Sequence, residues 1–130
     1  MASPQPTILI TDDDRAFRET LQSVFEPRGF TTFLAGDGEE AVQIIRREHI
    51  HVALLDMHMP RLTGLETVQV AREVNSVLPF VLITAALDDS IRREAETAKV
   101  FNVLEKPVEL NAVTGVVADA FRQTYDWVVL

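Results

Sequence analysis

Five polar side chains of this sequence stand at the ends of short apolar runs, and together they suit one kind of chemistry. They are Asp12, Asp13, Asp56, Thr84 and Lys106. Carboxylates that gather at one point repel one another and need a cation, and Mg²⁺ binds through one or two carboxylates, waters and phosphate oxygens. An aspartate can accept a phosphoryl group as an acyl phosphate, whose oxygens a hydroxyl and an ammonium group would hydrogen-bond. The set therefore indicates magnesium-assisted phosphoryl transfer to an aspartate.

The run Val-Ala-Leu-Leu-Asp at 52–56 carries the most informative of these residues. Four consecutive apolar residues favour a strand buried on both faces, as in a parallel sheet. Asp56 then stands at the carboxyl end of a central strand, which is the edge where ligands bind in open α/β sheets. We interpret Asp56 as the phosphoryl acceptor. In a parallel sheet the other four residues reach the same edge and serve it.

The elements that must position these residues alternate along the chain. Apolar, β-branched runs predict strands over residues 7–11, 30–35, 52–56, 80–84 and 100–104. Helical spacing of apolar residues predicts helices over about residues 14–26, 39–48, 65–75, 88–98 and 108–126. Such alternation is typical of an α/β fold with a parallel sheet covered by helices on both faces. We expect a flavodoxin-like sheet in the order 2-1-3-4-5, with five helices on two faces.

Composition bounds the classes of protein to which the chain can belong. A length of 130 residues predicts one domain, and a formal net charge of -8 disfavours non-specific binding of nucleic acid. The absence of cysteine excludes disulfides and thiolate metal sites. The amino terminus lacks the pattern of a signal peptide, and no apolar stretch reaches the roughly 18 residues of a membrane span. A cytoplasmic protein is the expectation.

The domain plan has three parts. Residues 1–6, with two prolines, predict a disordered lead, residues 7–124 the folded domain, and residues 125–130 an apolar tail. The tail either packs back on the last helix or serves as a partner or dimer contact, or as a stub of a longer protein. The histidines His49 and His51 are expected on the surface before the third strand, and Asp14 is expected to cap the first helix.

Five motifs give the sequence a family resemblance. They are Ile-Leu-Ile-Thr-Asp-Asp-Asp at 8–14, Leu-Leu-Asp-Met-His-Met-Pro at 54–60, Gly-Leu-Glu at 64–66, Ile-Thr-Ala at 83–85 and Leu-Glu-Lys-Pro at 104–107. In this order and spacing, the chain resembles the receiver domain of two-component response regulators, chemotaxis regulators included. The resemblance covers about residues 7–122.

The resemblance implies a role for each candidate residue. The implied ligands of Mg²⁺ are the carboxylates of Asp12, Asp13 and Asp56 and the backbone carbonyl of His58. Asp56 is the implied phosphorylation site, Thr84 the switch hydroxyl and Lys106 the lysine that contacts the phosphoryl group. The bond between Lys106 and Pro107 is implied to be cis.

The implied function is a phosphoacceptor signalling switch. A histidine kinase or a histidine phosphotransfer protein would donate the phosphoryl group, and the change would reach a downstream output protein or domain through the face formed by the fourth helix, the fifth strand and the fifth helix. A dimer is possible. The domain would catalyse only its own phosphorylation and dephosphorylation, so it is expected not to be an enzyme in the usual sense.

The sequence departs from the family pattern in the fifth strand. The position three before Lys106 is usually aromatic in the family, and here it is Val103. Phe101 lies two residues earlier and is expected on the same face if the strand is regular. The usual small pair before the strand is replaced by Lys99 and Val100.

Two other functions compete with the switch. The first is a phosphohydrolase of the haloacid-dehalogenase type, because Asp12 and Asp14 fit the Asp-x-Asp pattern that follows the first strand in that family. The second is a pseudo-receiver that serves only as a docking module.

Overall fold

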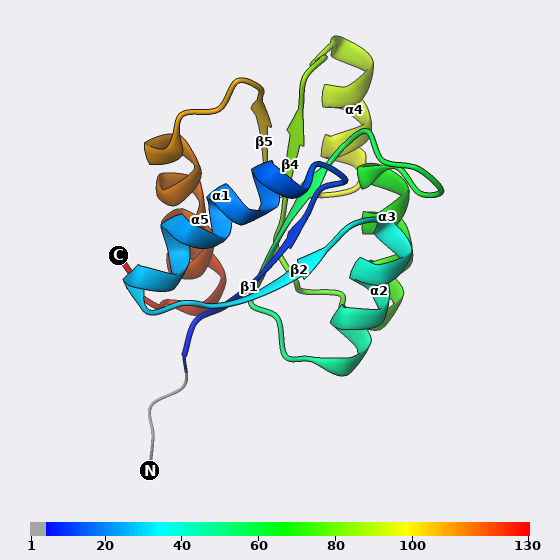
Figure 1. Cartoon of the computed structure of the whole chain (residues 1–130). Helices are drawn as coiled ribbons and strands as arrows, with labels where there is room; N and C mark the ends of the chain where they lie inside the picture. The colour runs from blue at the N-terminus through cyan, green and yellow to red at the C-terminus, as the bar shows by residue number, and fades with distance from the viewer. Residues whose placement is uncertain (1–4) are drawn as a thin grey trace.

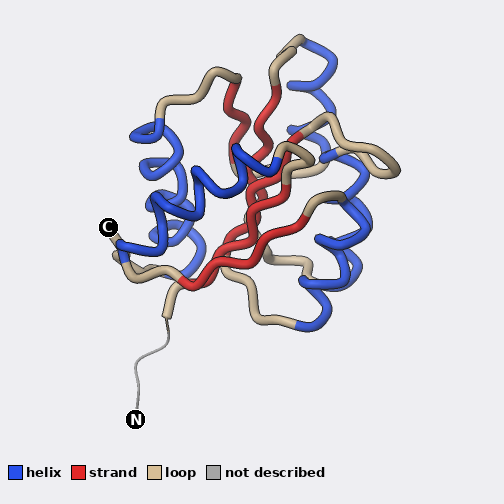
Figure 2. The backbone as a smooth tube through the Cα atoms, viewed as in Figure 1, coloured by secondary structure: helices blue, strands red, loops and turns tan. Residues whose placement is uncertain are grey.

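The computed structural model describes residues 5–130, and within them the chain forms one parallel sheet with helices on both faces (Figure 1 and Figure 2). The strand order is β2-β1-β3-β4-β5, and each neighbouring pair is parallel. The predicted fold class and strand order are therefore confirmed. Of the predicted lead over residues 1–6, residues 1–4 lie outside the described part of the chain.

The elements follow the predicted order closely. The strands are β1 (Thr7–Thr11), β2 (Thr31–Ala35), β3 (Val52–Asp56), β4 (Phe80–Thr84) and β5 (Asn102–Glu105). The helices are α1 (Arg15–Phe25), α2 (Gly38–Arg47), α3 (Gly64–Val74), α4 (Asp89–Thr97) and α5 (Leu110–Tyr125), with a short 3₁₀ helix, η1 (Glu26–Arg28), after α1.

The strand β5 begins two residues later than predicted, because the end of α4 uses the intervening residues. Lys99 adopts a left-handed conformation with φ 57°. Its backbone N–H donates to the carbonyl of Glu96, and the N–H of Val100 donates to the carbonyl of Ala95. These bonds satisfy carbonyls that the end of a helix leaves free. Residues 99 and 100 therefore close the helix and cannot join the strand.

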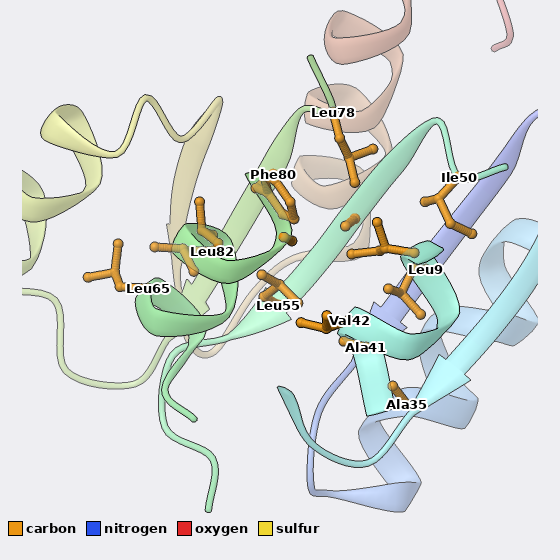
Figure 3. Packing of buried hydrophobic residues seen from close by; sticks show 14 of the residues in the cluster. Leu9, Ala35, Ala41, Val42, Ile50, Leu55, Leu65, Leu78, Phe80 and Leu82 are labelled. Atoms are coloured by element: carbon orange, nitrogen blue, oxygen red, sulfur yellow. The ribbon is translucent and has the colours of Figure 1, made fainter. Parts of the chain in front are cut away.

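The core is divided between the two faces of the sheet. Helices α2, α3 and α4 cover one face, and α1 and α5 cover the other (Figure 1). In β3, Ala53 and Leu55 belong to the first cluster of buried residues, while Val52 and Leu54 belong to the second. Figure 3 shows Leu55 and Leu82 among the side chains of the first cluster. This burial on both faces explains why β3 consists of consecutive apolar residues.

Local signals fix the start of the helices next to the carboxyl edge of the sheet. The side chain of Asp14 accepts the N–H groups of Ala16 and Phe17, at 3.0 and 3.3 Å, which confirms its predicted role as the cap of α1. Thr63 caps α3 in a reciprocal capping box with Glu66. The capped ends hold the loops after β1 and β3 in defined positions, because the orphan N–H groups have partners.

The prediction that His51 lies on the surface is wrong. Only 8% of this residue is exposed. Its Nδ1 accepts the N–H of Thr7 at 3.0 Å, and its carbonyl accepts the Tyr125 hydroxyl at 2.6 Å. Phe121 and Trp127 contact the ring, with centroids 5.6 and 5.0 Å away. A polar residue before an apolar run does not reveal this environment, because its partners come from distant parts of the chain.

The predicted apolar tail lies partly against the domain. Trp127 and Val129 pack on the cluster beneath α1 and α5, whereas Val128 is 79% exposed and Leu130 is 49% exposed. The contacts of Trp127 and Val129 agree with the alternative in which the tail packs back. Over residues 5–130, no helix has the length and apolar character needed to cross a membrane.

Candidate functional site

The candidate residues meet at the carboxyl edge of the sheet, as the parallel arrangement predicts. Asp12 and Asp13 follow β1, Asp56 ends β3, Thr84 ends β4 and Lys106 follows β5. One carboxylate oxygen from each of the three aspartates lies within 4.8 Å of the other two. The Lys106 Nζ lies 3.0 Å from Asp12 Oδ2 and 3.6 Å from Asp56 Oδ1. The structure therefore brings three acids and one ammonium group to a common point.

Hydrogen bonds of the sheet hold the strand ends in register around this point. The N–H of Asp12 donates to the carbonyl of Ala35 at 3.1 Å, and the N–H of Met57 donates to the carbonyl of Ile83 at 2.8 Å. The N–H of Lys106 donates to the carbonyl of Thr84, also at 2.8 Å. The last bond places the backbones of the predicted switch hydroxyl and the predicted phosphate-contacting lysine side by side.

The two acids after β1 differ in their surroundings. Asp12 is only 2% exposed, and its carboxylate accepts the N–H of Asp14 at 2.8 Å as well as the Lys106 ammonium. The Arg18 guanidinium donates to the Asp12 carbonyl at 2.5 Å, which fixes the backbone at this residue. Asp13 is exposed. Asp12 is thus held in place by protein partners, while the carboxylate of Asp13 faces solvent at the mouth of the site.

The electrostatics of the site leave negative charge uncompensated. Burial raises the pKa of Asp56, the charge of Asp12 raises it further, and the Lys106 ammonium opposes the rise only in part. Burial alone would lower the pKa of Lys106, but the hydrogen bond and charge of Asp12 together with the charge of Asp56 outweigh it, so this pKa is raised. One ammonium group therefore faces three carboxylates, and the site favours a further cation.

The donor set fits Mg²⁺. Carboxylate oxygens are hard ligands, and a site with few protein ligands leaves coordination positions for waters and phosphate oxygens. The carbonyl of His58, the fourth predicted ligand, belongs to the loop between β3 and α3. The loop contacts the end of β3 at Gly64, where the Gly64 N–H donates to the Met57 carbonyl at 2.9 Å.

Thr84 is fully buried, and its hydroxyl oxygen accepts the N–H of Ala86 at 3.2 Å. This bond ties the threonine to the loop between β4 and α4. The side chain of Glu105 accepts the N–H of Leu87 in the same loop at 3.3 Å. The peptide bond between Lys106 and Pro107 is cis, as the resemblance implies.

Phe101 and Val103 were expected on one face only if the strand is regular, and the strand does not extend to Phe101. Val103 packs against the cluster beneath α2, α3 and α4, whereas Phe101 packs against the cluster on the opposite face. The reason is that β5 begins at Asn102, so Phe101 lies in a bend before the strand and does not follow its alternation. Phe101 therefore does not occupy the place of the aromatic residue that Val103 replaces.

Sequence reasoning missed one neighbour of the site. The ring of Phe17 lies under the Lys106 ammonium, with Nζ 4.5 Å from the ring centroid. The spacing of apolar residues predicted the helix that contains Phe17 but not where its ring lies. No local pattern could have revealed this contact, because Phe17 and Lys106 are far apart in the sequence.

Comparison with known proteins agrees with this geometry. A family model described as "Response regulator receiver domain" matches residues 8–118. Among curated proteins, "Response regulator MprA" of Mycobacterium leprae (strain TN) is 35% identical over 117 residues, covering 90% of this chain and 51% of that protein. The Mycobacterium ulcerans (strain Agy99) protein of the same name is 36% identical over 117 residues, covering 90% of this chain and 50% of that protein. The chain thus spans about half the length of these relatives.

Solved structures show the same fold. A CheY-like response regulator receiver domain protein from Methanospirillum hungatei JF-1 superposes with a TM-score of 0.91 at 20% identity, covering 95% of this chain and 98% of that chain. The receiver domain of the Francisella response regulator 1452 superposes with a TM-score of 0.85 at 26% identity, covering 92% and 98%.

Proposed function

This chain belongs to the family of response regulator receiver domains, and from that premise we propose that it is a phosphoacceptor signalling switch. Asp56 accepts a phosphoryl group from a histidine kinase or a histidine phosphotransfer protein, in a reaction that depends on Mg²⁺. The phosphorylated domain then changes its binding to an output protein or domain. The observation that carries this proposal is the convergence of three carboxylates and the Lys106 ammonium at the edge where β3 ends.

The chemical step is a displacement at phosphorus. An oxygen of the Asp56 carboxylate attacks the phosphorus of a phosphohistidine, the new P–O bond forms as the P–N bond breaks, and the leaving imidazole takes up a proton from solvent. Mg²⁺, held by Asp12, Asp13, Asp56 and the His58 carbonyl, would neutralise charge on the transferring group. The protein's part is positioning and charge stabilisation.

Lys106 and Thr84 act on the phosphoryl group once it is attached. The Lys106 ammonium already lies 3.6 Å from the Asp56 carboxylate, within reach of an oxygen on a group bonded there. The Thr84 hydroxyl ends the neighbouring strand and is tied to the following loop through Ala86. A bond from this hydroxyl to the phosphoryl oxygen would pull on that loop, and the loop leads into α4.

The domain is proposed to turn over no metabolite and to act in the cytoplasm, with dimers as one possible output. Its signal would pass through the face formed by α4, β5 and α5. Since Val103 offers no ring to change rotamer, we expect the loop between β4 and α4 to carry the change without an aromatic switch. A local charge change of this kind biases an element that has two arrangements.

The test compares three proteins incubated with acetyl phosphate, with and without Mg²⁺, and weighed by intact mass spectrometry. The wild type should gain one phosphoryl group only with Mg²⁺, and Asp56→Asn should gain none. Asp14→Asn is the matched control, because it removes a neighbouring charge while an asparagine keeps the helix cap. Phosphorylation of Asp56→Asn to the extent of the wild type would refute the proposal.

The phosphohydrolase alternative has less support. It needs Asp12 and Asp14 as catalytic groups, but the Asp14 carboxylate is occupied by the N–H groups of Ala16 and Phe17. Repeated turnover of para-nitrophenyl phosphate with Mg²⁺, abolished by Asp12→Asn and retained in Asp56→Asn, would favour it. A pseudo-receiver is disfavoured by the complete acidic set.

A further inference from the structure

The Lys106 ammonium is surrounded by two different kinds of group. Asp12 accepts a hydrogen bond from it at 3.0 Å, and Asp56 lies 3.6 Å away. The ring of Phe17 lies beneath it, 4.5 Å from Nζ to the centroid. An ammonium group at this distance from an aromatic face is attracted by the negative charge of the ring's quadrupole. The lysine head is thus held by two acids and by one ring.

A lysine at a phosphoryl site needs such support because its stem is flexible. Four rotatable carbons carry a compact charge, and the side chain of Lys106 is 25% exposed. The carboxylates alone attract the ammonium but allow it to shift between them, because the Asp12 and Asp56 oxygens both lie within reach. A ring face restricts this freedom without competing for the donors that the phosphoryl group would use.

The place of Phe17 is itself fixed by the sequence around it. The Asp14 side chain accepts the backbone N–H of Phe17, so the cap of α1 also sets the start of the turn that carries the ring. The ring is partly buried against the cluster beneath α1 and α5. Both the backbone and the ring of Phe17 are therefore held in place, and the ring gives the flexible Lys106 side chain a fixed surface to contact.

We propose that Phe17 is a positioning residue whose ring face holds the Lys106 ammonium beside the Asp56 carboxylate. The proposal rests on the proposed function, because it concerns the lysine that contacts the phosphoryl group. It assigns Phe17 a role beyond the packing of α1. That role depends on the charge distribution of the ring and not on its volume.

The experiment replaces Phe17 in the full chain by singly, doubly and triply fluorinated phenylalanines. Fluorine withdraws charge from the ring face while it adds apolar surface, so the cation–π attraction weakens but packing does not. Two quantities are measured: the rate of phosphorylation by acetyl phosphate with Mg²⁺, and the exchange of the Lys106 ammonium protons with water by ¹⁵N NMR. The same amino acids placed at Phe33 serve as the control, since no cation within residues 5–130 lies over that ring.

The expected result is a stepwise change with each added fluorine. The rate should fall by about three-fold in all, the size typical of an exposed cation–π pair, and proton exchange at Lys106 should accelerate. Phe17→Leu should resemble the triply fluorinated protein, and Phe17→Tyr should resemble the wild type. Equal exchange and equal rates throughout the series would overturn the inference.

The two proposals fail separately. Failure of the wild type to accept a phosphoryl group would refute the proposed function, whereas the NMR series needs no phosphorylation and still decides whether the ring holds the ammonium. A loss of rate that appears equally at Phe33 would also count against a role of Phe17.

Discussion

Asp56 is the central residue of the site, and its ionised form destabilises the folded protein. Burial and the charge of Asp12 raise its pKa. When the pKa of a carboxyl is higher in the folded state than in the unfolded state, the folded protein loses stability as the pH rises through these two values. The reason is that the unfolded state releases the proton first. At neutral pH the ionised form of Asp56 therefore lowers the stability of the folded protein, and a bound cation would relieve this cost.

This disadvantage predicts that Asp56→Asn is more stable than the wild type at pH 7 without Mg²⁺, by about 1 kcal/mol. The amide removes one of three clustered charges and keeps nearly the same shape. Urea unfolding followed by circular dichroism measures the difference, and added Mg²⁺ should shrink it because only the wild type has the complete acid set. An equal or lower stability of the variant would contradict the account.

His51 provides a second titration at the opposite end of β3. Burial and the neighbouring charge of His49 lower its pKa below the ordinary value of 6.5. As the pH falls below that value, the unfolded chain takes up a proton that the folded chain does not. The free energy of unfolding should therefore decrease as the pH falls, and at higher pH the protonation of His51 should no longer affect it.

His51→Asn separates this titration from the packing of the ring. Asparagine offers an oxygen acceptor to the Thr7 N–H but does not titrate in this range. We expect the variant to be about 1–2 kcal/mol less stable above pH 7, through lost aromatic contacts, and to show a flatter pH dependence below about pH 6.5. Fluorescence of Trp127, the only tryptophan, follows the unfolding. His49→Asn, which removes the neighbouring charge but keeps the buried ring of His51, should retain the pH dependence with a smaller amplitude. Parallel curves for the wild type and His51→Asn would disprove the assignment.

At the scale of the elements, most of the fold could be predicted because each local signal agrees with the sheet. Consecutive apolar residues predicted β3 and β4. The acid after the first strand, together with the helical spacing that follows, predicted α1. The end of α4 could not be placed, because Lys99 adopts a left-handed conformation that sequence patterns assign to glycine or asparagine. The surroundings of His51 and Phe17 were missed for another reason. Trp127 is 76 residues from His51, and Lys106 is 89 residues from Phe17, and no local pattern reaches that far.

The junction of β3 and α3 is the element on which the site's geometry depends most. A Cβ added at Gly64 would stand 2.7 Å from the Asp56 carbonyl oxygen and 2.8 Å from Leu82 Cδ2. Real Cβ atoms do not approach backbone so closely, so the loop that holds His58 would have to move. The absence of a side chain at residue 64 therefore allows α3 to begin directly against the end of β3.

This close approach predicts that Gly64→Ala lowers the free energy of unfolding by about 1–3 kcal/mol and also slows phosphorylation of Asp56. Gly115→Ala is the matched control, because nothing lies within 4 Å of a Cβ at that place in α5. Alanine in a helix should there raise stability by about 0.5–1 kcal/mol. Urea unfolding measures both, and a neutral Gly64→Ala would show that the junction yields more easily than its contacts imply.

At the scale of the whole molecule, β3 connects two regions of different character. Its carboxyl end carries the acid cluster, and His51, just before its first residue, joins the start of β1 to α5 and the tail through the Thr7 N–H and the Tyr125 hydroxyl. The alternation of strands and helices was sufficient to predict that the acids, Thr84 and Lys106 share one edge, because parallel strands end on the same side. The contacts at the other end depend on the tail, whose placement its composition left open.

The most direct measurement of the central claim is amide NMR of the wild type and Asp56→Asn, titrated with beryllofluoride and Mg²⁺ as a mimic of the phosphoryl group. If one site joins these strand ends, the amide signals of Asp13, Asp56, Thr84 and Lys106 should shift together in the wild type, with a common saturation point, and should remain unchanged in Asp56→Asn. Shifts at only some of these residues, or the same response in both proteins, would contradict the account.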